Sequence, residues 1–391
     1  MNFPNTIIYG HGSLEKVGEE AAKLGGKALI ISDRIMKELG YLKECHDYLE
    51  QAGIPYIDYL EVDQEPTDIF VREALEKQAE HRTDIMIALG GGSCIDTAKA
   101  AAVLAANDGE IHEYMNNRKR ADKLAQPLIA IPTTAGTGSE ATDVTIITNT
   151  SNDVKMMIKQ PAFMPASAIV DAKLSMSSPP GTTAATGVDA LTHAIEAYIS
   201  RKAHPFSDQL ALSSAKLIME NMKAVYDNGS NEKAREGMAL GALQGGMAFS
   251  NSSVCLVHGM SRPIGALFHV PHGISNAMLL PVVLEFTKES CEDRLAEMAR
   301  FIYPEKMDWQ DPEAAVYLVD EVLRLCRQLD IPNMKAWGVA EEEFFYSLPK
   351  MAEDAVESGS PGNNPRVPEK EEIIALYKEA FTYEYPAYLS K

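Results

Sequence analysis

The alternation of short apolar runs with stretches of helical period constrains the fold of this chain more than any other feature. Up to about residue 175, the pattern predicts strands over 27–32, within 54–62, and over 85–89 and 127–131. Helices are predicted between them over 35–52, 70–81 and 94–106. Strands that alternate with helices indicate parallel βαβ units, and uniformly apolar strands fit a sheet covered on both faces. We therefore expect an α/β domain with a parallel sheet.

The pattern changes after Pro179, Pro180 and Gly181, which mark a domain boundary. Beyond them the period is helical throughout and no strand is predicted. Examples of these helices span 206–226, 234–250, 312–329 and 341–355, and a turn-rich loop at 357–368 precedes a last helix. We expect a dinucleotide-binding α/β domain at 1–180 and an all-α metal-binding and catalytic domain at 181–391.

The charge balance excludes several classes of partner. Acidic residues outnumber basic ones by 56 to 36, so the net charge of −20 disfavours nucleic acids and anionic membrane surfaces. No apolar stretch approaches the roughly 18 residues of a membrane span, and the N-terminus lacks a signal-peptide pattern. Five scattered cysteines without a CxxC pair predict reduced thiols in a cytoplasmic protein. Small molecules and metal cations remain as ligands.

Two features at predicted strand ends suggest a nucleotide. The strand at 85–89 enters a glycine turn at 90–93 and then a helix, an arrangement that lets backbone N–H groups approach a phosphate. The turn lacks the GxGxxG spacing, so a purely packing role stays open. Asp33 follows the strand at 28–32, where an acid typically binds a ribose diol. Asp33 is equally placed to cap the following helix.

A third cluster, with the sequence IPTTAGTGSEAT at 131–142, places hydroxyls and glycines directly after a buried strand. Open α/β sheets bind their ligands at the carboxyl ends of strands, although an ordinary polar turn has the same composition.

Two helical segments carry a possible metal site. Asp189, His193 and Glu196 fall on one stripe of the predicted helix at 186–200, while His258, His269 and His272 lie in an apolar segment at 255–280. Together they can supply three imidazoles and one carboxylate. That set suits Fe(II), Zn, Mn or Ni rather than Ca or Mg. A helical ion pair or a buried core histidine is the alternative for either segment alone.

Read together, these motifs resemble the iron-containing (group III) alcohol dehydrogenase family, which includes lactaldehyde reductase and 1,3-propanediol dehydrogenase. The resemblance extends over nearly the whole chain, from Tyr9 to Arg366. Its specific motifs are GGGSxxDxAK at 90–99, PTTAGTGSE at 132–140, GxDALTHAIEAY at 187–198, HGM at 258–260 and PHG at 271–273.

The resemblance implies a nucleotide-binding domain, a helical domain and a site in the cleft between them. It also implies a homodimer or larger homo-oligomer. The implied metal is Fe(II), replaceable by Zn, on Asp189, His193, His258 and His272. The implied cofactor is NAD(H), contacted by Asp33, Gly91, Gly92, Ser93, Thr133, Thr134, Thr137, Lys155 and Leu174.

The implied reaction interconverts a small aldehyde and its primary alcohol, with the metal as Lewis acid and with His258, Arg262 and His272 at the catalytic centre. The alternative is a related metal and NAD enzyme of the dehydroquinate synthase or glycerol dehydrogenase type. Two departures matter. Arg262 stands where many members have histidine, and Gln64–Thr67 replaces a PNPT-like stretch. Arg262 predicts an aldehyde bearing an acid group, such as sulfoacetaldehyde, unless it pairs with Glu196 or another acid.

Overall fold

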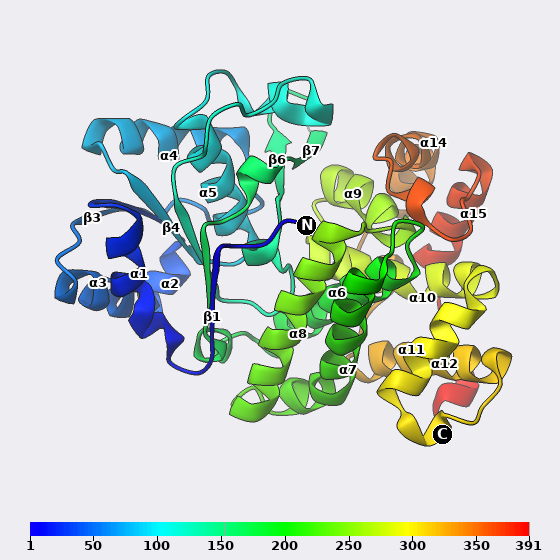
Figure 1. Cartoon of the computed structure of the whole chain (residues 1–391). Helices are drawn as coiled ribbons and strands as arrows, with labels where there is room; N and C mark the ends of the chain where they lie inside the picture. The colour runs from blue at the N-terminus through cyan, green and yellow to red at the C-terminus, as the bar shows by residue number, and fades with distance from the viewer. Residues whose placement is uncertain (153, 391) are drawn as a thin grey trace.

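The computed structural model describes residues 1–152 and 154–390, and within these ranges six strands form one parallel sheet (Figure 1). Every neighbouring pair of strands in the sheet runs parallel. The order across the sheet is β1 (Thr6–Tyr9), β8 (Ser167–Val170), β5 (Leu128–Pro132), β4 (Ile85–Gly90), β2 (Ala28–Ile31) and β3 (Tyr56–Tyr59). The prediction of an α/β domain with a parallel sheet is confirmed.

Helices cover both faces of this sheet because successive strand residues point to opposite sides. On β2, Ile30 packs toward α1 (Val17–Leu24) and α3 (Tyr41–Gln51). Its neighbour Leu29 packs on the other face, toward α4 (Asp68–His81) and α5 (Gly92–Leu104). Burying each large aliphatic side chain contributes about 1.5–3 kcal/mol, which explains why these strands lack polar alternation.

The predicted helix at 35–52 is wrong as a single element. It is divided into α2 (Arg34–Glu38) and α3 by Gly40, which adopts φ +84°. That left-handed backbone suits glycine and ends the helical path, although the apolar period continues through it.

Four strands of the described chain were not predicted from the sequence. They are β1, β8 and the antiparallel hairpin of β6 (Val144–Asn149) and β7 (Val154–Lys159). β1 is an edge strand with Ile7 and Tyr9 partly exposed, so its sequence lacks a clear buried face. The hairpin strands are stabilised by pairing with each other and by packing over α5, which no local pattern reveals.

From Pro180 onward, the described residues form helices without any strand, as predicted. A single apolar core joins these helices. The helix α6 lies at the centre of this core and is buried over most of its length. None of the described helices combines the length and hydropathy needed to cross a membrane. The longer helices are α6 (Pro180–Ile199), α7 (Pro205–Asp227), α8 (Glu232–Asn251), α9 (Leu256–Phe268), α10 (His272–Thr287), α11 (Glu292–Ile302), α12 (Asp311–Gln328), α14 (Glu341–Glu357) and α15 (Lys370–Phe381).

The sheet and the helices meet at a close backbone contact between Gly138 and Gly246. Gly138 follows β5 in a left-handed conformation, with φ +60°, and Gly246 lies within α8. A Cβ on Gly246 would lie 2.6 Å from the Gly138 carbonyl oxygen. The two glycines therefore let α8 rest directly on the turn after β5.

We predict that Gly246→Ala lowers the free energy of unfolding by about 1–3 kcal/mol, because the added methyl group meets backbone atoms that cannot rotate away. Replacing glycine by alanine within a helix normally raises the free energy of unfolding, so the expected change has the opposite sign. Gly181→Ala is the control, since a Cβ at Gly181 meets no atom within 4 Å. Denaturant titration of both variants checks the prediction, and equal stability of the two would contradict it.

Candidate active site

A cavity of about 450 Å³ lies between the carboxyl ends of the parallel strands and the helices α6, α9 and α10. It combines the turns after β4 and β5 with the side chains of the predicted metal site. The sequence-predicted residues that line it are Gly91, Gly92, Ser93, Thr134, Thr137, Lys155, Asp189, His193, His258, Arg262 and His272.

Asp33 lies at the same sheet edge because β2, β4 and β5 are adjacent. Its Oδ1 accepts a hydrogen bond of 2.9 Å from the Met36 backbone N–H, so it does cap α2. Its Oδ2 faces the glycine turn, 3.6 Å from where a Gly90 Cβ would stand. The capping interpretation is correct, and it leaves one carboxylate oxygen turned toward the turn after β4.

The glycines of that turn have different roles. A Cβ on Gly92 would approach the Thr137 side chain to 2.8 Å, so Gly92 packs the two turns together. A Cβ on Gly91 would meet nothing closer than 3.8 Å, and Gly91 opens onto the cavity at the N-terminus of α5. Free N–H groups and the helix dipole at this end favour a phosphate group, which fits the pyrophosphate of a dinucleotide.

A buried network fixes these turns, and sequence reasoning missed it. The Lys99 ammonium donates to Ser139 Oγ at 2.8 Å, to Thr142 Oγ1 at 2.9 Å and to the Val144 carbonyl at 2.8 Å. Asp96 accepts from Ser139 Oγ at 2.6 Å. Burial lowers the pKa of Lys99 to about 8. The spacing of Asp96 and Lys99 in one motif was the available signal, but their partners lie some 40 residues away in sequence.

Three predicted cofactor residues do not line the cavity. Thr133 is buried and its N–H bonds the Gly90 carbonyl, while Leu174 packs in the core beneath the sheet. Asp33, the third, is beside the turn but outside the lining. Lys155 does line the cavity, from β7, and forms an ion pair of 3.0 Å with Glu65.

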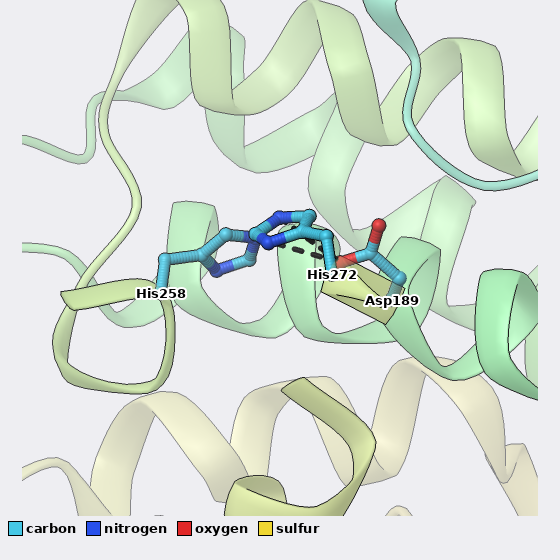
Figure 2. Close-up of side chains that lie close together, drawn as sticks. All are labelled: Asp189, His258 and His272. Atoms are coloured by element: carbon cyan, nitrogen blue, oxygen red, sulfur yellow. Dashed lines mark ion pairs between the residues drawn. The ribbon is translucent and has the colours of Figure 1, made fainter. Parts of the chain in front are cut away.

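Asp189, His258 and His272 converge in the cavity and could hold a metal ion (Figure 2). Asp189 Oδ1 lies 3.5 Å from His258 Nε2 and 4.0 Å from Nε2 of both His272 and His193. Asp189 and His193 share one face of α6, one turn apart, as predicted. His269 instead ends α9 with φ 53° and does not line the cavity.

Glu196 has a supporting role that the sequence did not reveal. Its carboxylate accepts from His258 Nδ1 at 2.7 Å and from the backbone N–H groups of Cys255 at 2.8 Å and Val257 at 2.6 Å. The bond assigns a proton to Nδ1, so Nε2 is the atom that can bind a cation. Nε2 is buried and has no hydrogen-bond partner in the described residues. The available signal for this role was the position of Glu196, seven residues after Asp189 on the same stripe of the helix.

The three imidazoles differ in protonation. Burial opposes charge on His258, but Glu196 and Asp189 outweigh it and raise its pKa to about 9. A proton and a metal ion therefore compete for the same Nε2 atom. Burial lowers the pKa of His193 to about 3 and that of His272 to about 4, which leaves both neutral.

Asn276 completes the surroundings of Asp189. It is fully buried one turn beyond His272 in α10, and its Nδ2 donates to Asp189 Oδ1 at 2.7 Å. The same Nδ2 lies 3.1 Å from His272 Nε2. Although burial opposes it, the nearby imidazoles hold the pKa of Asp189 well below its usual value. The carboxylate is thus ionised and fixed in orientation.

Arg262 faces the cavity from α9 without an acidic partner. Its Nη2 contacts Met157 Sδ at 3.0 Å, while its Nε and Nη1 are buried and unpartnered in the described structure. Glu196, the expected alternative partner, is occupied by the first turn of α9. No described carboxylate lies within 4 Å of the Arg262 guanidinium, so the expected ion pair is not formed. Burial lowers the pKa of Arg262 to about 10, and the charge of Glu196 opposes this lowering only through space.

Two protein-family models, which match the two halves of the chain, identify its family. Residues 4–172 match the iron-containing alcohol dehydrogenase model, and residues 183–381 match the C-terminal model of the Fe-containing alcohol dehydrogenase family. The chain belongs to the iron-containing alcohol dehydrogenase family. It is therefore an oxidoreductase, and the family implies binding of a metal and NAD(H).

Individual relatives are similar to this chain over nearly its whole length. The 1,3-propanediol dehydrogenase of Citrobacter freundii is 36% identical over 97% of each chain, and the lactaldehyde reductase of Escherichia coli is 34% identical over 97% of this chain and 99% of that one. The structure of sulfoacetaldehyde reductase from Bifidobacterium kashiwanohense with NAD⁺ superposes with a TM-score of 0.86 at 27% identity, over 98% of each chain.

We predict that Glu196→Gln weakens metal affinity of this alcohol dehydrogenase by about 10- to 100-fold, the usual effect of removing a carboxylate that orients a metal-binding histidine. Titration of Fe(II) into chelator-treated enzyme measures it. Glu220→Gln, which removes an equivalent charge from an exposed ion pair on α7, is the control. Unchanged Fe(II) affinity in Glu196→Gln would show that Glu196 only supports the fold.

Proposed function

We propose that this enzyme interconverts a small aldehyde bearing an acid group, of the sulfoacetaldehyde type, and its primary alcohol, with NAD(H) as cofactor. The observation that carries the proposal is the unpaired guanidinium of Arg262. A buried charge without a partner costs several kcal/mol, and such charges are normally compensated. An anionic substrate tail would supply that compensation at the point where the reaction occurs.

The position of Arg262 supports this role. It lies four residues after His258 on α9, so both side chains project toward one cavity. Its free Nε and Nη1 groups can form charge-assisted hydrogen bonds to a sulfonate or carboxylate. A family relative of matching fold is named sulfoacetaldehyde reductase, which supports an acid-bearing aldehyde as a substrate class within this architecture.

We further propose Asp189, His193, His258 and His272 as ligands of Fe(II), which Zn can replace. The donor set fits, because Asp189 Oδ1 lies 3.5–4.0 Å from the Nε2 atoms of three imidazoles. Two of these imidazoles are neutral, and His258 would exchange its Nε2 proton for the metal. When bound, the metal supplies a Lewis acid for the substrate oxygen and NADH supplies the hydride.

The chain's own residues position these groups. Glu196 orients His258, and Asn276 orients Asp189 and His272, while Arg262 orients the substrate tail. For the cofactor we propose the turns after β2, β4 and β5, with Lys155. The contacts implied for Thr133 and Leu174 would involve their backbone, because both side chains are buried away from the cavity.

We propose two domains, 1–180 and 181–391, with the active site between them, in a cytoplasmic homodimer or larger homo-oligomer. The family models match on either side of this division. β1 offers an unpaired sheet edge with Ile7 and Tyr9 partly exposed, which is compatible with self-association.

Asp33 predicts a preference for NAD(H) over NADP(H), because a carboxylate near a 2′-phosphate is repulsive. Asp33→Asn keeps a side-chain oxygen that can cap α2 but removes the charge. We expect it to raise the NADPH-to-NADH ratio of kcat/KM by about tenfold, as removal of a close like charge would. Steady-state kinetics with both cofactors measures the ratio, and equal use of both by the wild type would contradict the prediction.

Arg262→His tests the proposed substrate class. We expect it to lower kcat/KM for sulfoacetaldehyde by about 10- to 150-fold, because a charge-assisted contact contributes about 1.5–3 kcal/mol. Activity toward propanal, which has no acid group, should change much less. The initial rate of NADH consumption with the two aldehydes measures the effect.

The comparison of the two aldehydes distinguishes a substrate-binding role of Arg262 from a structural role. If both substrates lose activity by the same factor, Arg262 is structural. A wild type that prefers propanal to sulfoacetaldehyde would refute the proposed substrate class while leaving the dehydrogenase activity intact.

A further inference from the structure

Two cations, Lys155 and Arg262, line the cavity where β7 meets α9. Lys155 and Met157 share the face of β7 that lines the cavity, and Met157 contacts the Arg262 guanidinium at 3.0 Å. Gly265 lies one turn beyond Arg262 on α9, and a Cβ there would stand 2.8 Å from Lys155 Nζ. The absence of a side chain at Gly265 thus leaves room for the Lys155 ammonium one turn beyond Arg262.

Only one cation of this pair has a counter-ion. Glu65, from the loop between β3 and α4, accepts from Lys155 Nζ at 3.0 Å and lines the same cavity. Among the described residues, the neutral Met157 sulfur is the only hydrogen-bond partner of the Arg262 guanidinium. Glu65 belongs to the segment in which the sequence departs from the PNPT-like stretch of the family, as Arg262 departs from the usual histidine. Both departures therefore act on the charge of one small region.

We propose that Glu65 determines the charge of the accepted substrate tail. By neutralising Lys155, it leaves a single uncompensated charge of this pair, on Arg262, so the site selects a monoanionic sulfonate or carboxylate over a dianionic phosphonate. Without the Glu65 carboxylate, Lys155, which also lies in the proposed cofactor site, would add its charge to that of Arg262, and a second negative charge on the tail would be favoured. The inference rests on the proposed function, because it requires that Arg262 receive the acid group.

The test compares sulfoacetaldehyde with phosphonoacetaldehyde, two-carbon aldehydes whose tetrahedral tails differ in charge. Rates are measured at saturating NADH and at a pH above the second ionisation of the phosphonate, so that effects on the cofactor cancel in the ratio of kcat/KM. Glu65→Gln removes the charge with little change of shape. Glu61→Gln is the matched control, because Glu61 lies in the same loop but pairs with Arg34 outside the cavity.

The wild type should prefer sulfoacetaldehyde, and Glu65→Gln should shift the ratio toward phosphonoacetaldehyde by roughly tenfold, the lower end of a charge-assisted contact. Glu65→Asp and Glu61→Gln should keep the wild-type ratio. Calorimetric binding of 2-hydroxyethanesulfonate and 2-hydroxyethylphosphonate to the NADH-loaded holoenzyme, a complex that cannot react, should show the same shift in dissociation constants, which a merely structural role of Glu65 would not produce.

Different failures have different meanings. A wild type that prefers phosphonoacetaldehyde overturns this inference without any variant, and so does an unshifted ratio in Glu65→Gln. If propanal is preferred to both anionic aldehydes, the proposed function itself fails. An anionic preference with an unshifted ratio overturns the role of Glu65 alone.

Discussion

The ionised carboxylate of Asp189, buried in the middle of α6, sets the arrangement of the helical half. A buried carboxylate must be compensated, and the partners come from His193 on the same helix and from α9 and α10. α10 can deliver His272 because Gly273 lets its first turn approach α6, where a Cβ would stand 2.9 Å from the Ala185 carbonyl oxygen. Compensation of the Asp189 charge therefore requires that α6, α9 and α10 pack closely together.

The parallel sheet supplies the other side of the site for a simple geometric reason. The carboxyl ends of adjacent parallel strands share one edge, so residues following β2, β4 and β5 meet there although they are far apart in sequence. Lys99 then connects the turn after β5 to the hairpin of β6 and β7 through three hydrogen bonds. Because the hairpin carries Lys155 and Met157, this network also places the side chains that face Arg262.

Local sequence was sufficient for features that depend on periodicity and was insufficient for those that depend on distant partners. The parallel sheet, the helical second half and the convergence of Asp189 with His258 and His272 follow from local patterns and motifs. The break at Gly40 was missed because a left-handed residue does not interrupt the apolar period. The hydrogen bonds of Glu196 to α9 were missed because its spacing from Asp189 indicates which face of the helix it shares but not its partners, which lie some 60 residues away in sequence.

The selection of an anion that we propose for so acidic a chain depends on the local charges. The chain carries −20, yet the cavity is lined by Lys155, Lys159, Lys202 and Arg262 against the carboxylates Glu65, Asp96 and Asp189. Exposed charges are screened beyond about 8–10 Å at physiological ionic strength, so the acidic surface weakly affects a ligand inside the cavity. Within it, Asp96 is engaged with Ser139 and Ile146, Asp189 with the histidines, and Glu65 with Lys155. Every one of these carboxylates already has a partner, and that is why the charge of Arg262 remains for a substrate to neutralise.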